Sequence, residues 1–208
     1  MIVDLHVHTI YSGDSLIAPE EVIDQAVELG LDGICITEHD CYELSGVAEL
    51  LAENMPIKVF RGVEVSTDLG HMLVYGVSDW QNFPKVKPVP AQMLIDFARE
   101  RGGVCIPAHP FRFASDGIAD RIETLAGIFA IEGWNGRCDA QETRLALDYA
   151  ERCGLKVIGG SDAHVLGHLG TCVTVFENRV ETIAELVAEL KAGRFEACRL
   201  TVSTEYFL

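Results

Sequence analysis

Short apolar runs alternate with longer segments of helical periodicity along this 208-residue chain. Several of the runs are apolar throughout, as in Ile34-Cys35-Ile36, which is typical of strands buried on both faces of a sheet. The runs predict strands at residues 2–8, 33–37, 58–65, 71–76, 103–108, 128–133, 156–160 and 171–176.

Apolar residues at the helical period predict helices between these strands. The first helix begins with Pro19, which suits a first turn because the N–H that proline lacks would have no partner there. It ends at Gly30, which suits the position after a helix. The proline-rich segment 79–90 is predicted to be a surface loop, with a lid as one possible role. The predicted helices span residues 19–29, 44–54, 91–101, 140–153 and 180–192, with a weaker one at 118–125.

The repeated strand-then-helix order predicts one α/β domain over residues 1–208. The chain is short for the eight units of a full TIM barrel, so we favour a distorted barrel with fewer units, and an open doubly wound sheet is the alternative. In both architectures the functional residues lie beyond the C-terminal ends of the parallel strands.

Charge and cysteine content narrow the classes of partner and compartment. The chain holds 32 acidic and 16 basic residues, a formal net charge of −16, so we expect it to be repelled by duplex nucleic acid and by anionic membranes. A small anion held at a local positive site is compatible with this charge. The sequence contains no signal-peptide pattern and no membrane-length apolar run, and its seven scattered cysteines form no CxxC pair, so we expect a cytoplasmic protein with reduced thiols.

Histidines gather at the ends of the predicted strands. Five of them lie at or just past a C-terminal strand end, namely His6, His8, His39, His109 and His164. His71 instead begins a strand, but a hairpin between Glu64 and His71 would return it to the same end. Six imidazoles would then meet at one rim, and imidazole is the commonest nitrogen ligand of Zn²⁺, Fe²⁺ and Mn²⁺.

Three carboxylates accompany the histidines at these strand ends: Asp14, Glu64 and Asp162. Nine ligands are too many for one tetrahedral ion, and they suit two or three divalent ions of Zn, Mn or Fe with open positions for water. Open, clustered sites of this kind favour hydrolysis over a structural zinc site.

The residues around these ligands form sequence blocks that resemble the PHP (polymerase and histidinol phosphatase) family of metal-dependent phosphoesterases. Together the blocks are specific, they follow the family's order, and they span residues 4–164. They are Asp4-Leu5-His6-Val7-His8-Thr9 with Ser12-Gly13-Asp14-Ser15; Thr37-Glu38-His39-Asp40; Gly62-Val63-Glu64 with Gly70-His71; and Pro107-Ala108-His109-Pro110 with Gly160-Ser161-Asp162-Ala163-His164.

The resemblance implies a distorted (β/α)7 barrel with a trinuclear metal centre. In the family's pattern a histidine or a carboxylate stands at the place of Asp14, and the second block usually has aspartate where this chain has Glu38, so we expect Glu38 to act only on the surroundings of the ligands. The implied ligand sets are His6, His8, Glu64 and Asp162 for one ion; Glu64, His71 and His109 for a second; and Asp14, His39 and His164 for a third.

The implied reaction is hydrolysis of a small phosphate ester, in which a water bridging two ions becomes hydroxide and attacks phosphorus in line. Glu64 and Asp162 would act through the metals. Arg112 is the first candidate for binding the substrate phosphate and Arg137 the second, with a surface ion pair as the alternative for each. His168 could protonate the leaving oxygen, although a solvent-facing loop position is the alternative.

Two other functions remain open at this point. A metal-dependent amidohydrolase uses a similar ligand set, but the lysines Lys58 and Lys156 begin their strands and so lie at the far rim. A non-catalytic PHP module that holds metal in a regulatory role is the other alternative, against which the complete ligand set argues. The sequence leaves the particular substrate, the identity of the metals and the oligomeric state open.

Overall fold

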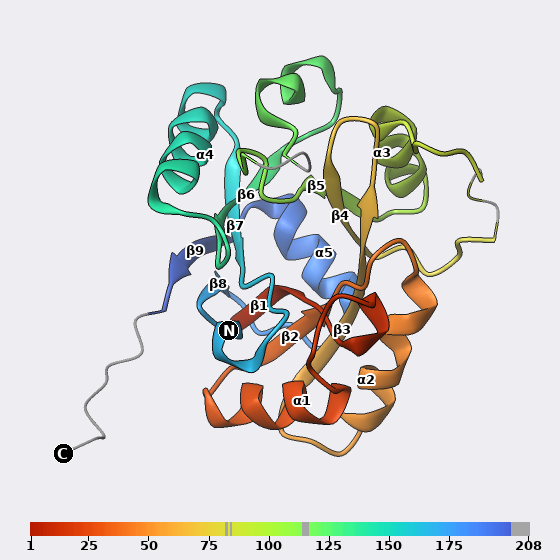
Figure 1. The fold of residues 1–208 in the computed structure, drawn as a ribbon, viewed down its shortest axis with the longest axis vertical. Coiled ribbons are helices and arrows are strands. Elements are labelled where there is room, and N and C mark those ends of the chain that lie inside the picture. Colours follow the sequence, from red (N-terminus) through yellow and green to blue (C-terminus); the bar gives the residue numbers. More distant parts are fainter. Residues whose placement is uncertain (82, 84, 114–116, 201–208) are drawn as a thin grey trace.

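A computed structural model describes residues 1–81, 83, 85–113 and 117–200, and a curled, mixed β-sheet lies at its centre (Figure 1). The seven strands of this sheet are, in spatial order, β5 (Val104–Pro107), β4 (His71–Tyr75), β3 (Lys58–Ser66), β2 (Gly33–Ile36), β1 (Ile2–Val7), β8 (Cys172–Phe176) and β9 (Phe195–Arg199). β6 (Ala130–Asn135) and β7 (Lys156–Gly160) form a separate parallel pair.

The sheet is parallel at its centre and antiparallel towards its edges. β1, β2 and β3 run parallel, whereas β4 is antiparallel to both β3 and β5, and β8 is antiparallel to both β1 and β9. Beyond the end of β7, Ala163 accepts a hydrogen bond from the backbone N–H of His8, so β7 ends beside β1. The predicted α/β domain is therefore confirmed, with a curled sheet, but the ladders among the described residues do not close a seven-unit barrel.

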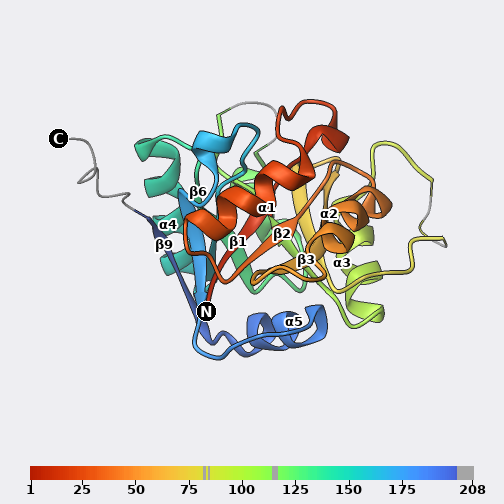
Figure 2. The ribbon, with the colours of Figure 1, turned by 90° about the horizontal axis from the view of Figure 1, so that it is seen from below.

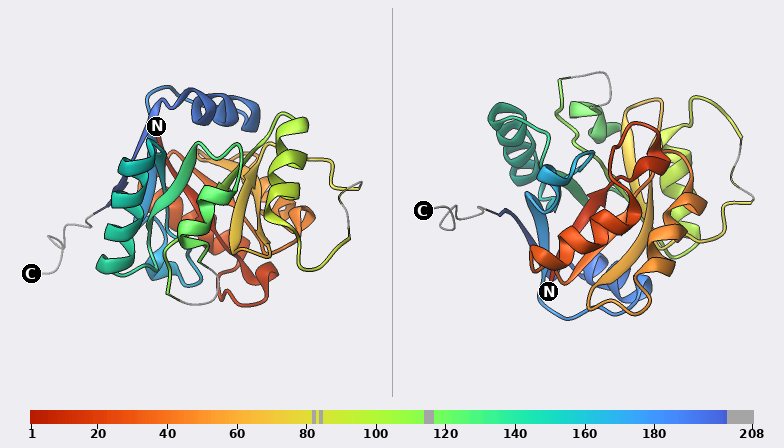
Figure 3. Two further views of the ribbon diagram at one scale, coloured as in Figure 1. Left: turned by 90° about the horizontal axis from the view of Figure 1, so that it is seen from above. Right: turned by 60° about the horizontal axis from the view of Figure 1, so that its bottom comes forward.

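Helices cover the outside of the sheet and one of its ends. α3 (Ala91–Glu100) and α4 (Ala140–Cys153) lie on opposite sides of the domain, and α1 (Pro19–Glu28) and α2 (Gly46–Leu51) cover β1 and β2 (Figure 3). α5 (Ile183–Ala192) lies across the end where β1 begins (Figure 2), and its Leu186 and Leu190 are buried against the sheet interior. The opposite end, where the parallel strands finish, stays open for a site.

Three elements differ from the sequence prediction. β9 was not predicted, since its short Phe-Glu-Ala-Cys-Arg run lacks a clear apolar pattern and depends on pairing with β8. The helix predicted at 44–54 is α2 preceded by a 3₁₀ turn (Tyr42–Ser45), and the weak one at 118–125 is a 3₁₀ helix (Ala119–Thr124). The predicted loop 79–90 includes positions 82 and 84, which lie outside the described residues.

Within the described part of the chain, no helix has both the length and the apolar composition that a bilayer span requires.

Candidate metal centre

All nine predicted ligands lie at the open end of the sheet. His6 and His8 come from the end of β1, Glu64 comes from β3, and His71 begins β4. The other five ligands lie in the connections that follow the strands. β3 and β4 form the predicted hairpin, in which Ser66 pairs with His71, so His71 returns to the rim. A cavity of about 330 Å³ opens there, lined by Asp14, His39, Glu64, His71, His109, Arg112, Arg137, Asp162 and His164.

Glu64 lies at the middle of this arrangement, and its carboxylate is buried. Its Oε1 is 2.9 Å from both His71 Nδ1 and His109 Nε2. Its Oε2 is 3.2 Å from the Nε2 atoms of both His6 and His8. Two groups of nitrogen donors therefore share one carboxylate, which is the geometry that a bridging ligand needs.

The two β1 histidines are held by their outer nitrogens. Glu132 Oε1 lies 2.9 Å from His6 Nδ1, and a carboxylate there can only accept, so His6 Nδ1 donates. His8 Nδ1 lies 2.8 Å from Ser12 Oγ, which itself donates to Glu38. His8 Nδ1 therefore also donates, and in the neutral tautomers both Nε2 lone pairs turn inward, where these two atoms are only 2.9 Å apart.

Glu38 completes this chain of contacts behind His8. Its carboxylate accepts hydrogen bonds from the Ser12 hydroxyl and from the hydroxyl and backbone N–H of Thr9. Burial is the main cause that raises the pKa of Glu38. The side chain thus lies one hydrogen-bonded step from a predicted ligand, at the position where the sequence departs from the usual aspartate.

A third group of ligands lies nearer the solvent. Asp14 Oδ2 is 3.2 Å from His39 Nε2 and 3.1 Å from His164 Nε2, and 54% of the Asp14 side chain is exposed. His39 also approaches Glu64, with its Nδ1 3.1 Å from Oε2. The ligand atoms therefore form adjoining clusters rather than one isolated group.

The buried inner cluster, formed by His6, His8 and Glu64, brings lone-pair-bearing nitrogen and oxygen atoms together with too few hydrogen atoms for each to accept a hydrogen bond. Glu64 Oε2 receives no well-formed hydrogen bond from the described residues, although the atom is buried. Burial lowers the pKa of His8 to about 4, so this imidazole is neutral at pH 7. For His6 the effect of burial is outweighed by Glu132, Glu64 and Asp162, which raise its pKa. In the metal-free protein a proton on His6 offsets the charge, and a divalent cation fits the same place because lone pairs face it from several sides.

Backbone strain marks the same region. His109 and Asp162 have φ values of 28° and 53°, in the left-handed region that non-glycine residues rarely adopt. Gly160, just before the Asp162 turn, approaches β1 so closely that a Cβ there would meet His6 Cβ at 2.4 Å. Strain of this kind is typical of functional sites, where surrounding packing holds it.

Sequence comparison finds relatives over different parts of the chain. The uncharacterized protein MJ0417 of Methanocaldococcus jannaschii is 27% identical over 187 residues, which are 85% of this chain and 70% of that protein. A 5'-3' exoribonuclease of Haemophilus influenzae is 30% identical over 91 residues, 44% of this chain and 32% of the relative. A phosphoribosyl 1,2-cyclic phosphate 1,2-diphosphodiesterase of Eggerthella lenta is 38% identical over 66 residues, 32% of this chain and 25% of the relative.

Solved structures with this fold cover most of the chain. A proposed metal-dependent phosphoesterase of Bifidobacterium adolescentis aligns with a TM-score of 0.62 and 22% identity, over 79% of this chain and 88% of that one. An amidohydrolase of Chromobacterium violaceum aligns with a TM-score of 0.69 and 18% identity, over 97% and 99%. The model of the PHP-associated family matches residues 141–195, which contain β7 and the predicted ligands Asp162 and His164. Over the segments that they cover, these matches confirm the resemblance to the PHP family that the sequence blocks predict.

Both arginines predicted to bind phosphate line the cavity at the candidate metal centre. Arg112 donates to Asn135 Oδ1 at 2.9 Å and to Asp162 Oδ2. Arg137 Nη1 lies 3.1 Å from His164 Nδ1 and 3.8 Å from Asp162 Oδ1. The two guanidinium groups therefore stand beside the carboxylate clusters, which makes the cavity attractive to an anion on that side.

His168 lies outside this cavity. It is exposed in a short 3₁₀ turn (Leu166–His168) and is not among the residues that line the cavity. Asp4 also has a structural role, since its carboxylate accepts the backbone N–H groups of Ser161 and Gly170 and so ties the Asp162 turn to β1. Burial raises the pKa of Asp4 to about 6.

Proposed function

We propose that the protein is a metal-dependent phosphoesterase that hydrolyses a small phosphate ester at a centre of two to three divalent ions. The observation that carries this proposal is the convergence of His6 Nε2, His8 Nε2 and Glu64 Oε2 within 3.2 Å, with Asp162 Oδ1 next to them. Such a group of buried lone pairs has little structural use without a cation.

The ligand sets are those that the resemblance to the PHP family implies, and the contacts within the site support them. His6, His8, Glu64 and Asp162 would hold one ion. Glu64 with His71 and His109 would hold a second, and Asp14 with His39 and His164 a third. When bound, such ions lower the pKa of water and polarise a phosphoryl oxygen. The position of β7 beside β1 supports a distorted (β/α)7 barrel as the frame for this centre.

The chain's own residues bind and orient the substrate. The guanidinium groups of Arg112 and Arg137 offer planar pairs of donors to the non-bridging phosphate oxygens. Asn135 orients Arg112 by accepting a hydrogen bond from its guanidinium group. Glu132 in turn orients both His6 and Asn135 by accepting their hydrogen bonds. The phosphate would thus be held between fixed cations and the ligand clusters, with its leaving group directed away from them.

An amidohydrolase with the same ligands is the second candidate, and an amidohydrolase shares the fold. Among the described residues that line the cavity, none is a lysine, whereas two are arginines. This composition favours a phosphate over an amide substrate.

The decisive experiment combines metal analysis with an ester screen. Protein purified without chelators should contain two to three metal ions per chain, and it should hydrolyse phosphomonoesters, whereas Glu64→Ala and Asp162→Asn should lose most of this turnover. Glu189→Gln changes a carboxylate on α5 that pairs with Arg194, and it should keep wild-type activity. Metal-free protein, or equal turnover in all variants, would refute the proposed function.

A further inference from the structure

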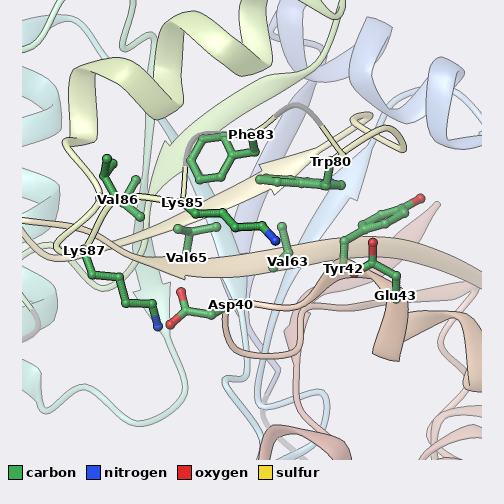
Figure 4. Close-up of a pocket in the computed structure, with 11 residues that line it drawn as sticks. Asp40, Tyr42, Glu43, Val63, Val65, Trp80, Phe83, Lys85, Val86 and Lys87 are labelled. Atoms are coloured by element: carbon green, nitrogen blue, oxygen red, sulfur yellow. The ribbon is translucent and has the colours of Figure 1, made fainter.

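A second cavity lies on the opposite face of β3 from the metal centre (Figure 4). Successive side chains of a strand point to opposite faces, so Glu64 faces the metal centre while Val63 and Val65 face this cavity. Its volume of about 480 Å³ lies within the range of small-molecule sites. The lining residues are Asp40, Tyr42, Glu43, Val63, Val65, Trp80, Phe83, Lys85, Val86, Lys87 and Val89.

Two aromatic rings, those of Trp80 and Tyr42, line this cavity. Trp80 donates its indole N–H to Val77 O at 3.0 Å and packs against the rings of Phe83 and Phe97, with centroids 5.3 and 5.4 Å away. These contacts leave the Trp80 ring in one orientation. The ring of Tyr42 lies 28° from parallel to it, with the two centroids 6.4 Å apart.

The aromatic lining suits a flat ligand. Trp80 and Tyr42 both border the cavity, and a planar ring gains contact area against such side chains. Tyr42 is itself held from behind, because the Arg61 guanidinium lies 4.2 Å from its ring centroid. The aliphatic floor of Val63 and Val65 would contact the edge of such a ring.

Two lysines give the cavity a positive side. Lys85 extends from the loop towards Val63, and Lys87 extends towards the Asp40 carboxylate (Figure 4). Asp40 and Glu43 also line the cavity, but within the described part of the chain neither lysine lies within 4.0 Å of a carboxylate oxygen. The Lys85 side is therefore where an anionic substituent would be placed.

The cavity and the metal centre share a rim. Asp40 lines the cavity and directly follows His39, which lines the metal centre. The Asp40 N–H donates to Glu64 O at 2.8 Å, and its carboxylate accepts the Ser66 N–H at 2.7 Å. The two spaces are thus separated by one hydrogen-bonded pair of chain segments, which a substrate longer than its phosphate group can cross.

We propose that this cavity binds the leaving group of the substrate, and that this leaving group carries an aromatic ring with an anionic substituent. The assignment rests on the proposed function, since it places the phosphate of the same molecule at the metal centre. In the reaction the oxygen of water bonds to phosphorus and the bond from phosphorus to the leaving oxygen breaks. That oxygen then takes up a proton, so the products are phosphate and the free hydroxyl compound.

The first test uses phenyl phosphate and glycerol 1-phosphate as probes. Because phenolate leaves more readily in any enzyme, the informative quantity is the change, between variants, in the ratio of the two kcat/KM values. Trp80→Leu and Tyr42→Leu each remove a flat wall and should lower the phenyl-to-glycerol ratio about tenfold, the usual scale of a lost stacking contact. Trp134→Leu alters the other tryptophan, on a different cavity, and should leave the ratio within twofold of wild type.

The second test addresses the lysines with 4-carboxyphenyl phosphate. Wild type should prefer this ester over phenyl phosphate, and the double variant Lys85→Ala, Lys87→Ala should lose the preference, while Lys191→Ala on α5 should retain it. Hydrolysis of both first probes with a ratio that none of the wall variants changes would overturn the cavity assignment alone. Absence of metal-dependent hydrolysis of every probe by wild type would overturn the proposed function, and the cavity assignment with it.

Discussion

Replacement of Glu132 by glutamine exchanges one carboxylate oxygen for an amide NH₂ with almost no change in volume. Glu132 Oε2 accepts hydrogen bonds from His109 N at 2.8 Å and from Asn135 Nδ2 at 3.0 Å, while Oε1 lies 2.9 Å from His6 Nδ1. Since Oε2 faces two donors, the glutamine oxygen must take that place, and the NH₂ then points at His6. His6 must accept at Nδ1 and carry its hydrogen on Nε2, so the lone pair that faces Glu64 is lost.

The expected size of this effect follows from the role of the lost contact. Removing the partner that orients a metal-binding histidine lowers metal affinity about 10- to 100-fold, which is about 1.4 to 2.7 kcal/mol. Glu132→Gln also removes a negative charge beside the cation and reverses the tautomer, so we expect a loss of about 100-fold.

The assay is competition for Zn²⁺ or Mn²⁺ with a chromophoric chelator at neutral pH. ¹⁵N NMR of the metal-free protein, at a pH above the raised pKa of His6, reports which nitrogen of the neutral imidazole carries the hydrogen. Glu189→Gln makes the same chemical exchange at a carboxylate on α5 that pairs with Arg194, and it should leave metal affinity within twofold of wild type. Wild-type affinity in Glu132→Gln, or an unchanged His6 tautomer, would refute the reasoning.

Three further predictions concern the same centre. Ser12→Ala removes the acceptor of the His8 Nδ1 hydrogen bond and the donor to Glu38, so chelator competition should show about tenfold weaker metal binding. Urea unfolding of the metal-free protein should show a free energy of unfolding lower by about 1–3 kcal/mol. Unchanged values in both measurements would exclude this orienting role. Arg112→Ala should raise KM for phenyl phosphate about tenfold with a smaller effect on kcat, and an unchanged KM in initial-rate assays would make this arginine structural. Because nearby carboxylates raise the pKa of His6 in the metal-free protein, metal binding should displace about one proton from it. Metal affinity should therefore fall as the pH drops below that raised pKa. Calorimetry in buffers of different ionisation enthalpy would detect the proton, and pH-independent binding without proton release would contradict the prediction.

Much of the architecture follows from local pattern. Solid apolar runs such as Ile34-Cys35-Ile36 mark the buried parallel strands, and the hairpin from Glu64 to His71 follows from the short polar turn between them. The directions of β8 and β9 do not follow, because an apolar run does not encode whether its neighbour runs parallel or antiparallel. Apart from the predicted hairpin of β3 and β4, a parallel sheet was expected, whereas β5, β8 and β9 also pair antiparallel to their neighbours.

The candidate site, too, could be predicted from the sequence only in part. Ligand candidates could be predicted because histidines and carboxylates at strand ends are unusual as packing residues. The role of Ser12 and the wall formed by Tyr42 and Trp80 could not, because each depends on contacts between segments far apart in sequence. Glu38 is an example of both. The sequence shows that glutamate replaces the usual aspartate, but only the structure shows that Glu38 contacts His8 through the Ser12 hydroxyl.

The central place of β1 has a consequence for the order of events during synthesis. Its neighbour β2 follows soon after it in the chain, but Ile2 pairs on the other side with Val175, near the far end of the fold. Until that partner emerges from the ribosome, one edge of β1 lacks its native pairing. Until Asp162 is made, His6 and His8 also lack one of their proposed co-ligands. Pairing over such a separation is slow, and an open strand edge invites association between nascent chains. Metal loading therefore comes late, and a cell that supplies ions too early would offer them to isolated imidazoles rather than to the finished centre.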